Sequence, residues 1–265
     1  MGRSKGPLQL LDNFYLHSGE SLTVPIDANG YYLTDNEGVN VEIDPGSHLG
    51  YENHELMLRQ IDRRPEDTTL YLGTHGHLDH IAYMSLVKAT LYLHKDDIGG
   101  VKTQDPLKTA AFLYENIPFP KIEQVTPIDE SFHIKIGRMA LQAIHTPGHT
   151  PGSMSYIVYH PEGNALIAGD TLWGMYCAGM GSDLDAWHDS LVRLQELVVT
   201  EGIRHVTFGH GPKGFVSEDP IEHIDKALKA MPTNLKAPAM NPWRNPYEEW
   251  QYEPVEHEHA ERKVA

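Results

Sequence analysis

The feature that most constrains this chain is a seven-residue stretch, THGHLDH at residues 74–80, which holds three histidines and one aspartate. These polar residues are interspersed with small or apolar ones. Imidazole and carboxylate groups are typical protein ligands of zinc and similar divalent ions. The stretch therefore predicts a metal site. The alternative is a polar loop whose residues only cap a helix.

The overall composition is typical of a globular protein. The chain has 265 residues, 40% of them hydrophobic, and no apolar run approaches the length of a membrane span. No apolar segment of a signal peptide follows its basic start. Cys177 is the only cysteine, which excludes an internal disulfide. We therefore expect a cytoplasmic protein without membrane contact.

The charge balance argues against nucleic acid as a partner. The 37 acidic and 21 basic side chains give a formal net charge of −16. Such a surface repels a phosphate backbone unless a basic patch overrides it, and the sequence shows no cluster of lysine and arginine. We therefore expect a small-molecule substrate as the partner.

The pattern of strands and helices places the histidine-rich stretch at the end of a strand. Residues 69–73 have the pattern of a short buried strand, and residues 78–88 that of a helix with one apolar face. The polar residues then lie at the mouth of an α/β sheet, where ligands bind. Further elements are expected around them: a hairpin at 29–33 and 38–43, a helix at 52–63, a strand at 90–94 and a surface excursion with a short helix at 99–120.

The second half of the chain repeats this arrangement of a strand followed by a polar loop. His149, Asp170 and His210 each follow a predicted strand, and each lies beside a glycine, which allows a sharp turn. Taken alone, each of these residues is more often a cap or a turn residue. The expected elements are a hairpin at 132–144, strands at 154–159, 164–168 and 205–208, and helices at 185–199 and 221–231.

The composition changes at Pro232. Residues 232–265 carry five prolines, two tryptophans, two tyrosines and many charges. We expect one catalytic domain at residues 1–231 and a C-terminal tail at 232–265. The aromatic residues of the tail suggest that it packs on the body or on a second subunit, as in a homodimer. The alternative is a partly disordered terminus.

With these motifs in this order, residues 20–215 resemble the metallo-β-lactamase superfamily. The resemblance implies an α/β fold, the metallo-β-lactamase-like αββα sandwich, with two sheets face to face, helices outside and a two-metal site at the sheet edge. Asp44 would support that site from behind. The ligands it implies are His75, His77 and His149 for the first ion, Asp79, His80 and His210 for the second, and Asp170 as the bridge.

Two divalent ions in such a site would hold a hydroxide between them, which attacks a carbonyl group or a phosphorus atom. Asp170 would bridge the ions and Asp79 could relay a proton to the leaving group, so both aspartates are expected to be catalytic. Sites of histidine and aspartate accept zinc, iron or manganese, and zinc is expected here. The predicted class is a dinuclear metal-dependent hydrolase.

Differences from particular branches of the family narrow the reaction. His77 stands where the flavodiiron branch has glutamate, and Asp170 argues against a true β-lactamase. We expect a lactonase, esterase or thioesterase, resembling the lactonase or glyoxalase II-like branch, that acts on a small and partly apolar substrate. The alternatives are a small-molecule phosphodiesterase or sulfatase, a mononuclear-iron enzyme like the persulfide dioxygenases, and a non-catalytic ligand sensor on the same fold.

The segment that follows Asp170 is apolar and begins at the predicted metal site. Its side chains suit a hydrophobic acyl or ring substrate, so Trp173, Met175 and Tyr176 are predicted to bind substrate. The alternative for Trp173 and the methionines is core packing. Cys177 has no assigned base beside it and is interpreted as a buried bystander.

Overall fold

The computed structural model describes residues 6–114, 117–172, 174–211 and 219–231, whose strands form two sheets. The seven-stranded sheet follows chain order: β1 (Leu8–Leu11), β2 (Phe14–Ser18), β3 (Gly30–Thr34), β4 (Asn40–Ile43), β5 (Leu70–Leu72), β6 (Leu91–His94) and β7 (Val125–Ile128). The five-stranded sheet has the order β12-β11-β10-β9-β8 and consists of β8 (His133–Ile136), β9 (Met139–His145), β10 (Met154–Tyr159), β11 (Asn164–Ile167) and β12 (Ile203–Thr207).

Both sheets are mixed. Strands β1 to β4 pair antiparallel, and β4 to β7 pair parallel. In the second sheet β8 to β11 pair antiparallel, whereas β11 and β12 are parallel. The predicted hairpins, β3 with β4 and β8 with β9, are confirmed. Because parallel strands end at the same edge of a sheet, the loops after β4 and β5 emerge together, and so do those after β11 and β12.

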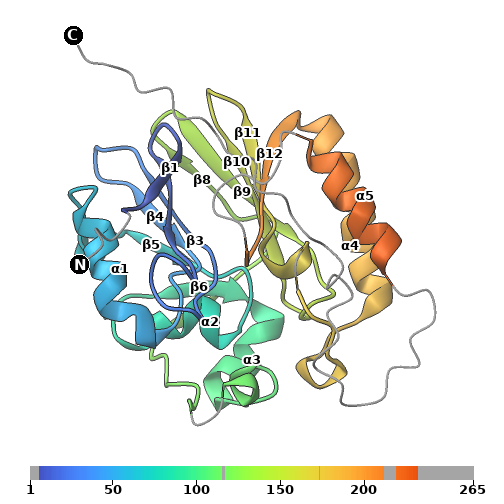
Figure 1. The fold of residues 1–265 in the computed structure, drawn as a ribbon, viewed down its shortest axis with the longest axis horizontal. Helices are drawn as coiled ribbons and strands as arrows, with labels where there is room; N and C mark the ends of the chain where they lie inside the picture. Colours follow the sequence, from blue (N-terminus) through green and yellow to red (C-terminus); the bar gives the residue numbers. More distant parts are fainter. Residues whose placement is uncertain (1–5, 115–116, 173, 212–218, 232–265) are drawn as a thin grey trace.

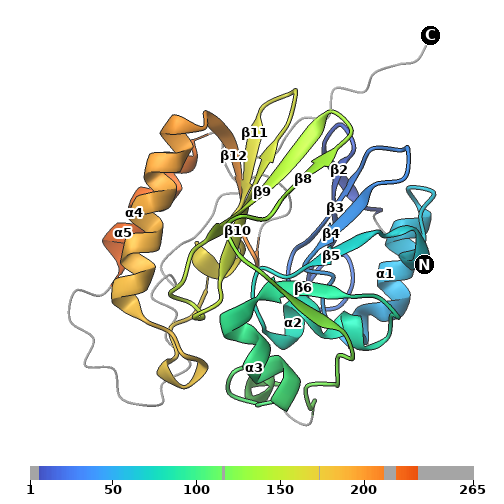
Figure 2. The same ribbon diagram turned by 180° about the vertical axis from the view of Figure 1, so that it is seen from behind.

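Helices cover the outer faces of the two sheets, so the predicted αββα sandwich is confirmed (Figure 1, and from behind in Figure 2). The first sheet carries α1 (Tyr51–Arg59), α2 (Leu78–Ile81) and α3 (Lys95–Thr103). The second sheet carries α4 (Leu184–Thr200) and α5 (Pro220–Ala230). Within the described ranges, none of these helices is long and apolar enough to cross a membrane.

The main core lies between the two sheets. Val41 and Ile43 of β4 point into it from one side, and Tyr156 and Val158 of β10 from the other. Burial of each such side chain contributes about 1.5–3 kcal/mol before the entropy cost of ordering it. A second core lies under α4, where Trp187 and its helical neighbours pack on the five-stranded sheet. Alternation along the strands therefore gives the first sheet an inner apolar face and an outer face turned to the helices.

The helix predicted at residues 78–88 is interrupted. α2 ends at Ile81, and a 3-10 turn over Ala82–Ser85 follows. Gly46, in the loop after β4, donates its N–H to the carbonyl of His80 and accepts from the N–H of Tyr83, each at 2.9 Å. The loop therefore takes the hydrogen-bonding partners that a continuous helix would use, which a reading of local periodicity does not detect.

Two predicted segments have different bounds in the structure. The excursion predicted at 99–120 begins earlier, as α3, and the helix predicted at 52–63 already ends at Arg59. The predicted tail at 232–265 lies outside the described residues, so the division into a domain at 1–231 and a tail stays a prediction.

Candidate metal centre

The seven residues predicted as metal ligands all lie at one edge of the sandwich, where strands of both sheets end. This edge brings together loops that are far apart in the chain. The preceding strands and one helix deliver the seven side chains: His75 and His77 after β5, Asp79 and His80 on α2, His149 after β9, Asp170 after β11 and His210 after β12.

One group consists of His75, His77, His149 and Asp170, whose ligand atoms lie within 4.8 Å of one another. Nε2 of His149 is 3.1 Å from Nδ1 of His77 and 3.3 Å from Oδ2 of Asp170. Nε2 of His75 lies 4.0 Å from the same aspartate oxygen. All four side chains are largely buried, so three imidazoles and one carboxylate converge with little exposure to solvent.

The other group consists of Asp79, His80 and His210. Oδ2 of Asp79 is 3.1 Å from Nε2 of His210 and 3.8 Å from Nε2 of His80. His210 is the exposed member of this group, with 32% of its side chain accessible. Asp79 and His80 are buried, so the second group reaches solvent through His210.

Asp170 lies between the two groups. Its Oδ2 is 3.3 Å from His149 and 3.7 Å from His210, and its Oδ1 is 3.5 Å from His80. One carboxylate thus reaches histidines of both groups. The family resemblance implied a bridging ligand at Asp170, and that role stays a prediction.

Asp44 holds the second group from behind. It follows β4 in the left-handed backbone region at φ 53°, a conformation that aspartate tolerates better than most residues. Its Oδ2 lies 2.9 Å from Nδ1 of His80, and its two oxygens accept from the N–H and the hydroxyl of Thr74 at 2.7 Å. With Nδ1 of His80 held by this carboxylate, its Nε2 faces the site and offers a lone pair to an ion that displaces the Nε2 proton.

Asp97, on α3, is a supporting residue that the sequence did not reveal. Its carboxylate accepts from the N–H of Gly76 at 2.8 Å, the N–H of Gly152 at 2.9 Å and the hydroxyl of Thr150 at 2.8 Å. Gly76 lies between two predicted ligands, and Thr150 follows a third. Asp97 therefore ties the loops of the first group together. Its only sequence signal was an acidic residue in the first turn of a helix.

The titration of the site follows from burial and from its charges. Burial, followed by the neighbouring histidines, holds the pKa of His75 and His77 well below the usual value. Burial alone would also lower the pKa of His80, but the carboxylates of Asp44, Asp170 and Asp79 outweigh it and raise that pKa to about 10. In the absence of a cation, the acidic groups therefore keep a proton on His80.

The residues fit a metal ion. Nε2 of His75, Nε2 of His80 and Oδ1 of Asp170 are buried and have no hydrogen-bond partner among the described residues. A buried acceptor without a donor costs about 1–3 kcal/mol, and Nε2 of His75 and Oδ1 of Asp170 are such acceptors. Nε2 of His80 joins them when an ion displaces its proton. A divalent cation satisfies such acceptors, and imidazole nitrogen with carboxylate oxygen is a donor set that zinc accepts.

A pocket of about 240 Å³ opens over this centre. Five candidate ligands line it, together with apolar and aromatic side chains: His77, Asp79, His149, Asp170 and His210 with Ala110, Leu113, Tyr114, Met175 and Met180. Met175 thus lies where a substrate contact was predicted. Tyr176 instead packs against the apolar cluster under α4 and α5, Cys177 is buried beside Ala110 and Met180, and Trp173 lies outside the described residues.

Tyr114 is the lining residue of greatest chemical interest, and no motif of the sequence predicted it. Its hydroxyl lies beside the carboxylate of Asp79 and can donate a hydrogen bond to it. Burial, followed by the charge of Asp79, raises the pKa of Tyr114 far above its usual value, so the hydroxyl keeps its proton. The pocket therefore holds a proton donor beside a carboxylate.

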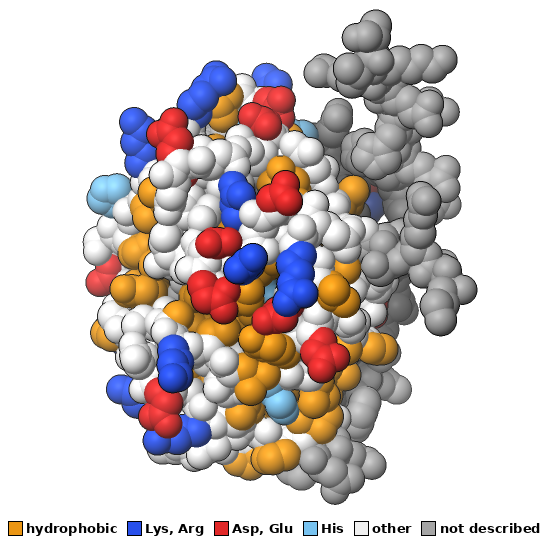
Figure 3. Space-filling model, turned by 90° about the vertical axis from the view of Figure 1, so that its left-hand side faces the viewer, with side chains coloured by type: hydrophobic (Ala, Val, Ile, Leu, Met, Phe, Trp, Pro, Cys, Tyr) orange, Lys and Arg blue, Asp and Glu red, His pale blue; other side chains and the backbone are white. Residues whose placement is uncertain are grey.

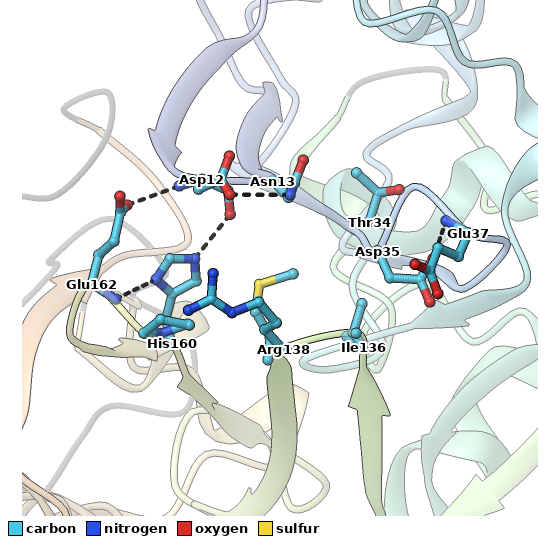
Figure 4. Close-up of a pocket in the computed structure, with 12 residues that line it drawn as sticks. Asp12, Asn13, Thr34, Asp35, Glu37, Ile136, Arg138, His160 and Glu162 are labelled. Carbon is cyan, nitrogen blue, oxygen red and sulfur yellow. Dashed lines mark hydrogen bonds between the residues drawn. The ribbon is translucent and has the colours of Figure 1, made fainter.

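A second cavity, of about 440 Å³, lies at the other end of the strands, among the hairpin turns (Figure 4). Its polar groups bind one another. Nε2 of His160 lies 2.9 Å from the carbonyl of Asp12, and Nδ1 of His160 accepts from the N–H of Glu162 at 3.0 Å. Both nitrogens of His160, the one histidine of this lining, are thus engaged, Nδ1 within its own turn and Nε2 with the turn that holds Asp12.

The chain belongs to the metallo-β-lactamase superfamily, since residues 24–201 match the sequence profile of that family. Together with the site, this makes it a metallo-hydrolase of the superfamily.

Among characterised and inferred relatives, the chain is similar to the probable metallo-hydrolase YqgX of Bacillus subtilis, with 27% identity over 71% of this chain and 87% of that protein. It is also similar to the hydroxyacylglutathione hydrolase of Brucella anthropi, with 31% identity over 67% of this chain and 62% of that protein. Among solved structures, the MIM-2 metallo-β-lactamase superposes with a TM-score of 0.64 at 19% identity, over 85% of this chain and 87% of that one. At this identity, the structural likeness concerns the fold alone.

Proposed function

We propose that this protein hydrolyses a carboxylic ester, lactone or thioester of a small and partly apolar substrate, and that the seven side chains of the candidate metal centre bind two zinc ions. The first ion would be held by His75, His77 and His149, the second by Asp79, His80 and His210, and both by Asp170. The approach of Asp170 to both groups supports a dinuclear centre over a mononuclear one.

The pocket over the centre is the observation that supports an acyl substrate over a phosphate or sulfate ester. Its lining combines candidate ligands with apolar and aromatic side chains. Its described lining includes neither lysine nor arginine, the residues that usually bind phosphate and sulfate groups. At about 240 Å³ the pocket suits a small acyl group rather than a large ligand.

Bound divalent ions would polarise the carbonyl oxygen of the substrate and lower the pKa of the attacking water. The chain's own residues supply the proton transfer. Asp79 stays ionised, because His80 and His210 lower its pKa against the effect of burial. Its Oδ2 can accept the proton of the attacking water and deliver it to the leaving oxygen or sulfur. The hydroxyl of Tyr114, bonded to Asp79, orients that carboxylate.

The similarity to hydroxyacylglutathione hydrolases supports a thioester as one member of this substrate class. The hydroxyacylglutathione hydrolase GloC of Haemophilus influenzae shares 27% identity over 57% of this chain and 70% of that protein. The apolar wall formed by Leu113, Met175 and Met180 favours acyl groups with a short hydrocarbon part over strongly polar ones.

The proposal is tested with four chromogenic substrates on the zinc-loaded protein: an aryl ester, a lactone, an acyl thioester and an aryl phosphate diester. Turnover of at least one acyl substrate should exceed that of the phosphate diester by about 100-fold or more, a difference of about 3 kcal/mol in transition-state binding. The activity should disappear in Asp170→Ala and after chelation. Asp185→Asn, an exposed change on α4, is the matched control.

Other results would favour the alternatives. Turnover only of the phosphate diester would replace acyl hydrolysis with phosphodiesterase chemistry. Oxygen-dependent turnover of a persulfide by protein that holds one iron at the candidate centre would favour the dioxygenase reading. A chain that binds its metals and turns over none of a broad substrate panel would be a ligand sensor.

A further inference from the structure

A second cluster of ligand-type side chains lies away from the candidate metal centre. It consists of His17 on β2, Glu42 on β4 and His54 on α1, with exposures of 0%, 0% and 1%. Val41 and Ile43 on either side of Glu42 point into the core between the sheets, so Glu42 points to the outer face, under α1. We call these three residues the α1 triad.

The ligand atoms of the triad lie against one another. Nε2 of His17 is 2.9 Å and Nε2 of His54 is 2.5 Å from the same oxygen, Oε1 of Glu42. The two imidazole nitrogens are 3.2 Å apart. In the candidate metal centre, the ring nitrogens of His77 and His149 lie 3.1 Å apart beside Asp170. The two clusters therefore share one arrangement, in which imidazole nitrogens face each other beside a carboxylate.

Two features of the first sheet place His17 in this position. The pairing of β2 with β3 shifts between Leu16 and Ser18, so His17 is the extra residue of a β-bulge, which redirects its side chain. Gly30, on the strand between His17 and Glu42, leaves room for the imidazole, because a Cβ there would lie 2.9 Å from Cε1 of His17 and would also meet the carbonyl of Asp44. The sheet is thus built to let His17 reach across β3 to Glu42.

Hydrogen bonding assigns the nitrogens of His17. Nδ1 lies 2.8 Å from the carbonyl of Gly30, and since a carbonyl only accepts, this nitrogen carries a proton. In the neutral ring, Nε2 of His17 is then a lone pair that faces an oxygen of Glu42 and Nε2 of His54. Nδ1 of His54 is buried without a hydrogen-bond partner among the described residues, so either nitrogen of that ring can carry its proton. The lone pair on Nε2 of His17 and the oxygen of Glu42 are then two acceptors with at most one proton between them, from Nε2 of His54. A cation would satisfy both acceptors.

We propose that His17, Glu42 and His54 bind a divalent transition-metal ion, separate from the candidate metal centre. Two imidazoles and one carboxylate are a donor set found in protein zinc sites. Glu42 can add its second oxygen, Oε2, which now accepts from the hydroxyl of Thr68 at 3.3 Å. The buried position leaves no access for a substrate, so the ion is structural and fastens α1 to the sheet.

The surroundings of the triad agree with a closed structural site. Tyr83 packs on His54 with ring centroids 4.1 Å apart, and Tyr32 lies directly opposite Glu42 in the β3–β4 pairing. The hydroxyls of both tyrosines are buried and have no hydrogen-bond partner among the described residues. The outer surface on the α1 side mixes acidic, basic and apolar side chains (Figure 3). Because all three side chains of the triad are buried, an ion would enter during folding or through opening of α1.

The test separates this site from the candidate metal centre. The full chain is prepared with His77→Ala, His80→Ala and Asp170→Ala, which removes ligands from both groups of that centre and leaves the triad intact. Zinc per chain is then measured by elemental analysis after equilibration with zinc and gel filtration. We expect this chain to retain one zinc ion and to lose it when His54→Gln is added. No retained zinc overturns the proposal.

A second comparison uses the chain with its candidate centre intact. His54→Gln and Glu42→Gln should each hold one zinc ion fewer than the unsubstituted chain, and the visible spectrum of cobalt(II) bound at the triad should be lost in both. His160→Gln is the matched control, because His160 is a buried histidine outside any ligand cluster. Equal zinc content in Glu42→Gln and the unsubstituted chain would show that protons, not a metal ion, occupy the triad.

Discussion

The carboxylate of Asp44 contacts His80, with Oδ2 of the aspartate 2.9 Å from Nδ1 of the imidazole. The same carboxylate accepts two hydrogen bonds from Thr74. One side chain at the end of β4 therefore orients a predicted ligand on α2 and fixes the start of the loop after β5. Asp44 therefore positions the site through defined hydrogen bonds, although it is not itself a predicted ligand.

Asp44→Asn tests this support. The amide offers one acceptor oxygen where the carboxylate offers two, so it cannot serve both Thr74 and His80 without turning its NH₂ group toward one of them. Zinc affinity of the group formed by Asp79, His80 and His210 should fall about 10- to 100-fold. Zinc titrations against a chromophoric chelator measure the change, and Asp185→Asn is the exposed control. Unchanged affinity of this group would show that Asp44 has no part in orienting it.

Asp97→Asn tests the tie between the loops of the first group. The carboxylate receives three donors from Gly76, Gly152 and Thr150, and an asparagine would turn its NH₂ group toward at least one of them. We expect the free energy of unfolding to fall by about 1–3 kcal/mol and the first metal position to bind zinc more weakly. Urea unfolding and zinc titration give the two readouts. Asp96→Asn is the control on the same helix, since that side chain is 45% exposed, and equal effects of the two substitutions would contradict the assigned role.

Tyr114→Phe tests the proton donor beside Asp79. Removal of the hydroxyl takes one hydrogen bond from a carboxylate that is proposed to move a proton. We expect kcat to fall about 10-fold, equivalent to about 1.4 kcal/mol, while zinc content stays the same. Tyr159→Phe is the matched control, because that hydroxyl is bonded to Gln142 and Glu201 away from the pocket. A rise in KM alone would make Tyr114 a binding residue instead.

The pH dependence of stability tests the charge of Glu42 in metal-free protein. Burial alone would raise the pKa of Glu42, but His54 and His17 lower it to about 2, from about 4.5 in an ordinary glutamate. A carboxyl with a lowered pKa stabilises the fold above its unfolded value and loses this contribution as the pH falls through the folded value. The difference in unfolding free energy between the unsubstituted chain and Glu42→Gln should therefore shrink between about pH 4.5 and pH 2. Urea unfolding at several pH values measures it, and a constant difference would show that Glu42 is not ionised in the fold.

The sequence indicated the seven candidate ligands through local signals, and the family resemblance implied the fold and their roles. Each candidate lies next to glycine or another candidate, either in a loop that follows a strand or at the start of α2. Asp97 and Tyr114 gave no such signal, because their partners are on loops that only the folded sheet edge brings near. The early end of α2 likewise depends on Gly46, more than thirty residues away in the chain.

The α1 triad is a second case in which the fold brings together residues that have no local signal in the sequence. His17, Glu42 and His54 lie in the interior of two strands and a helix, and each alone reads as an ordinary member of its element. Their meeting depends on a β-bulge, on a missing side chain at Gly30 and on the packing of α1. None of these follows from the spacing of the three residues in the chain.

The central claim is that the histidine-rich stretch serves two metal positions rather than one. X-ray data collected at the zinc absorption edge from zinc-loaded crystals test it most directly. We predict two anomalous peaks at the sheet edge, each about 2.0–2.1 Å from its histidine nitrogens. His75→Ala should weaken the first peak, His80→Ala the second and Asp170→Ala both. A single peak at this edge, lost alike in all three variants, would contradict the account.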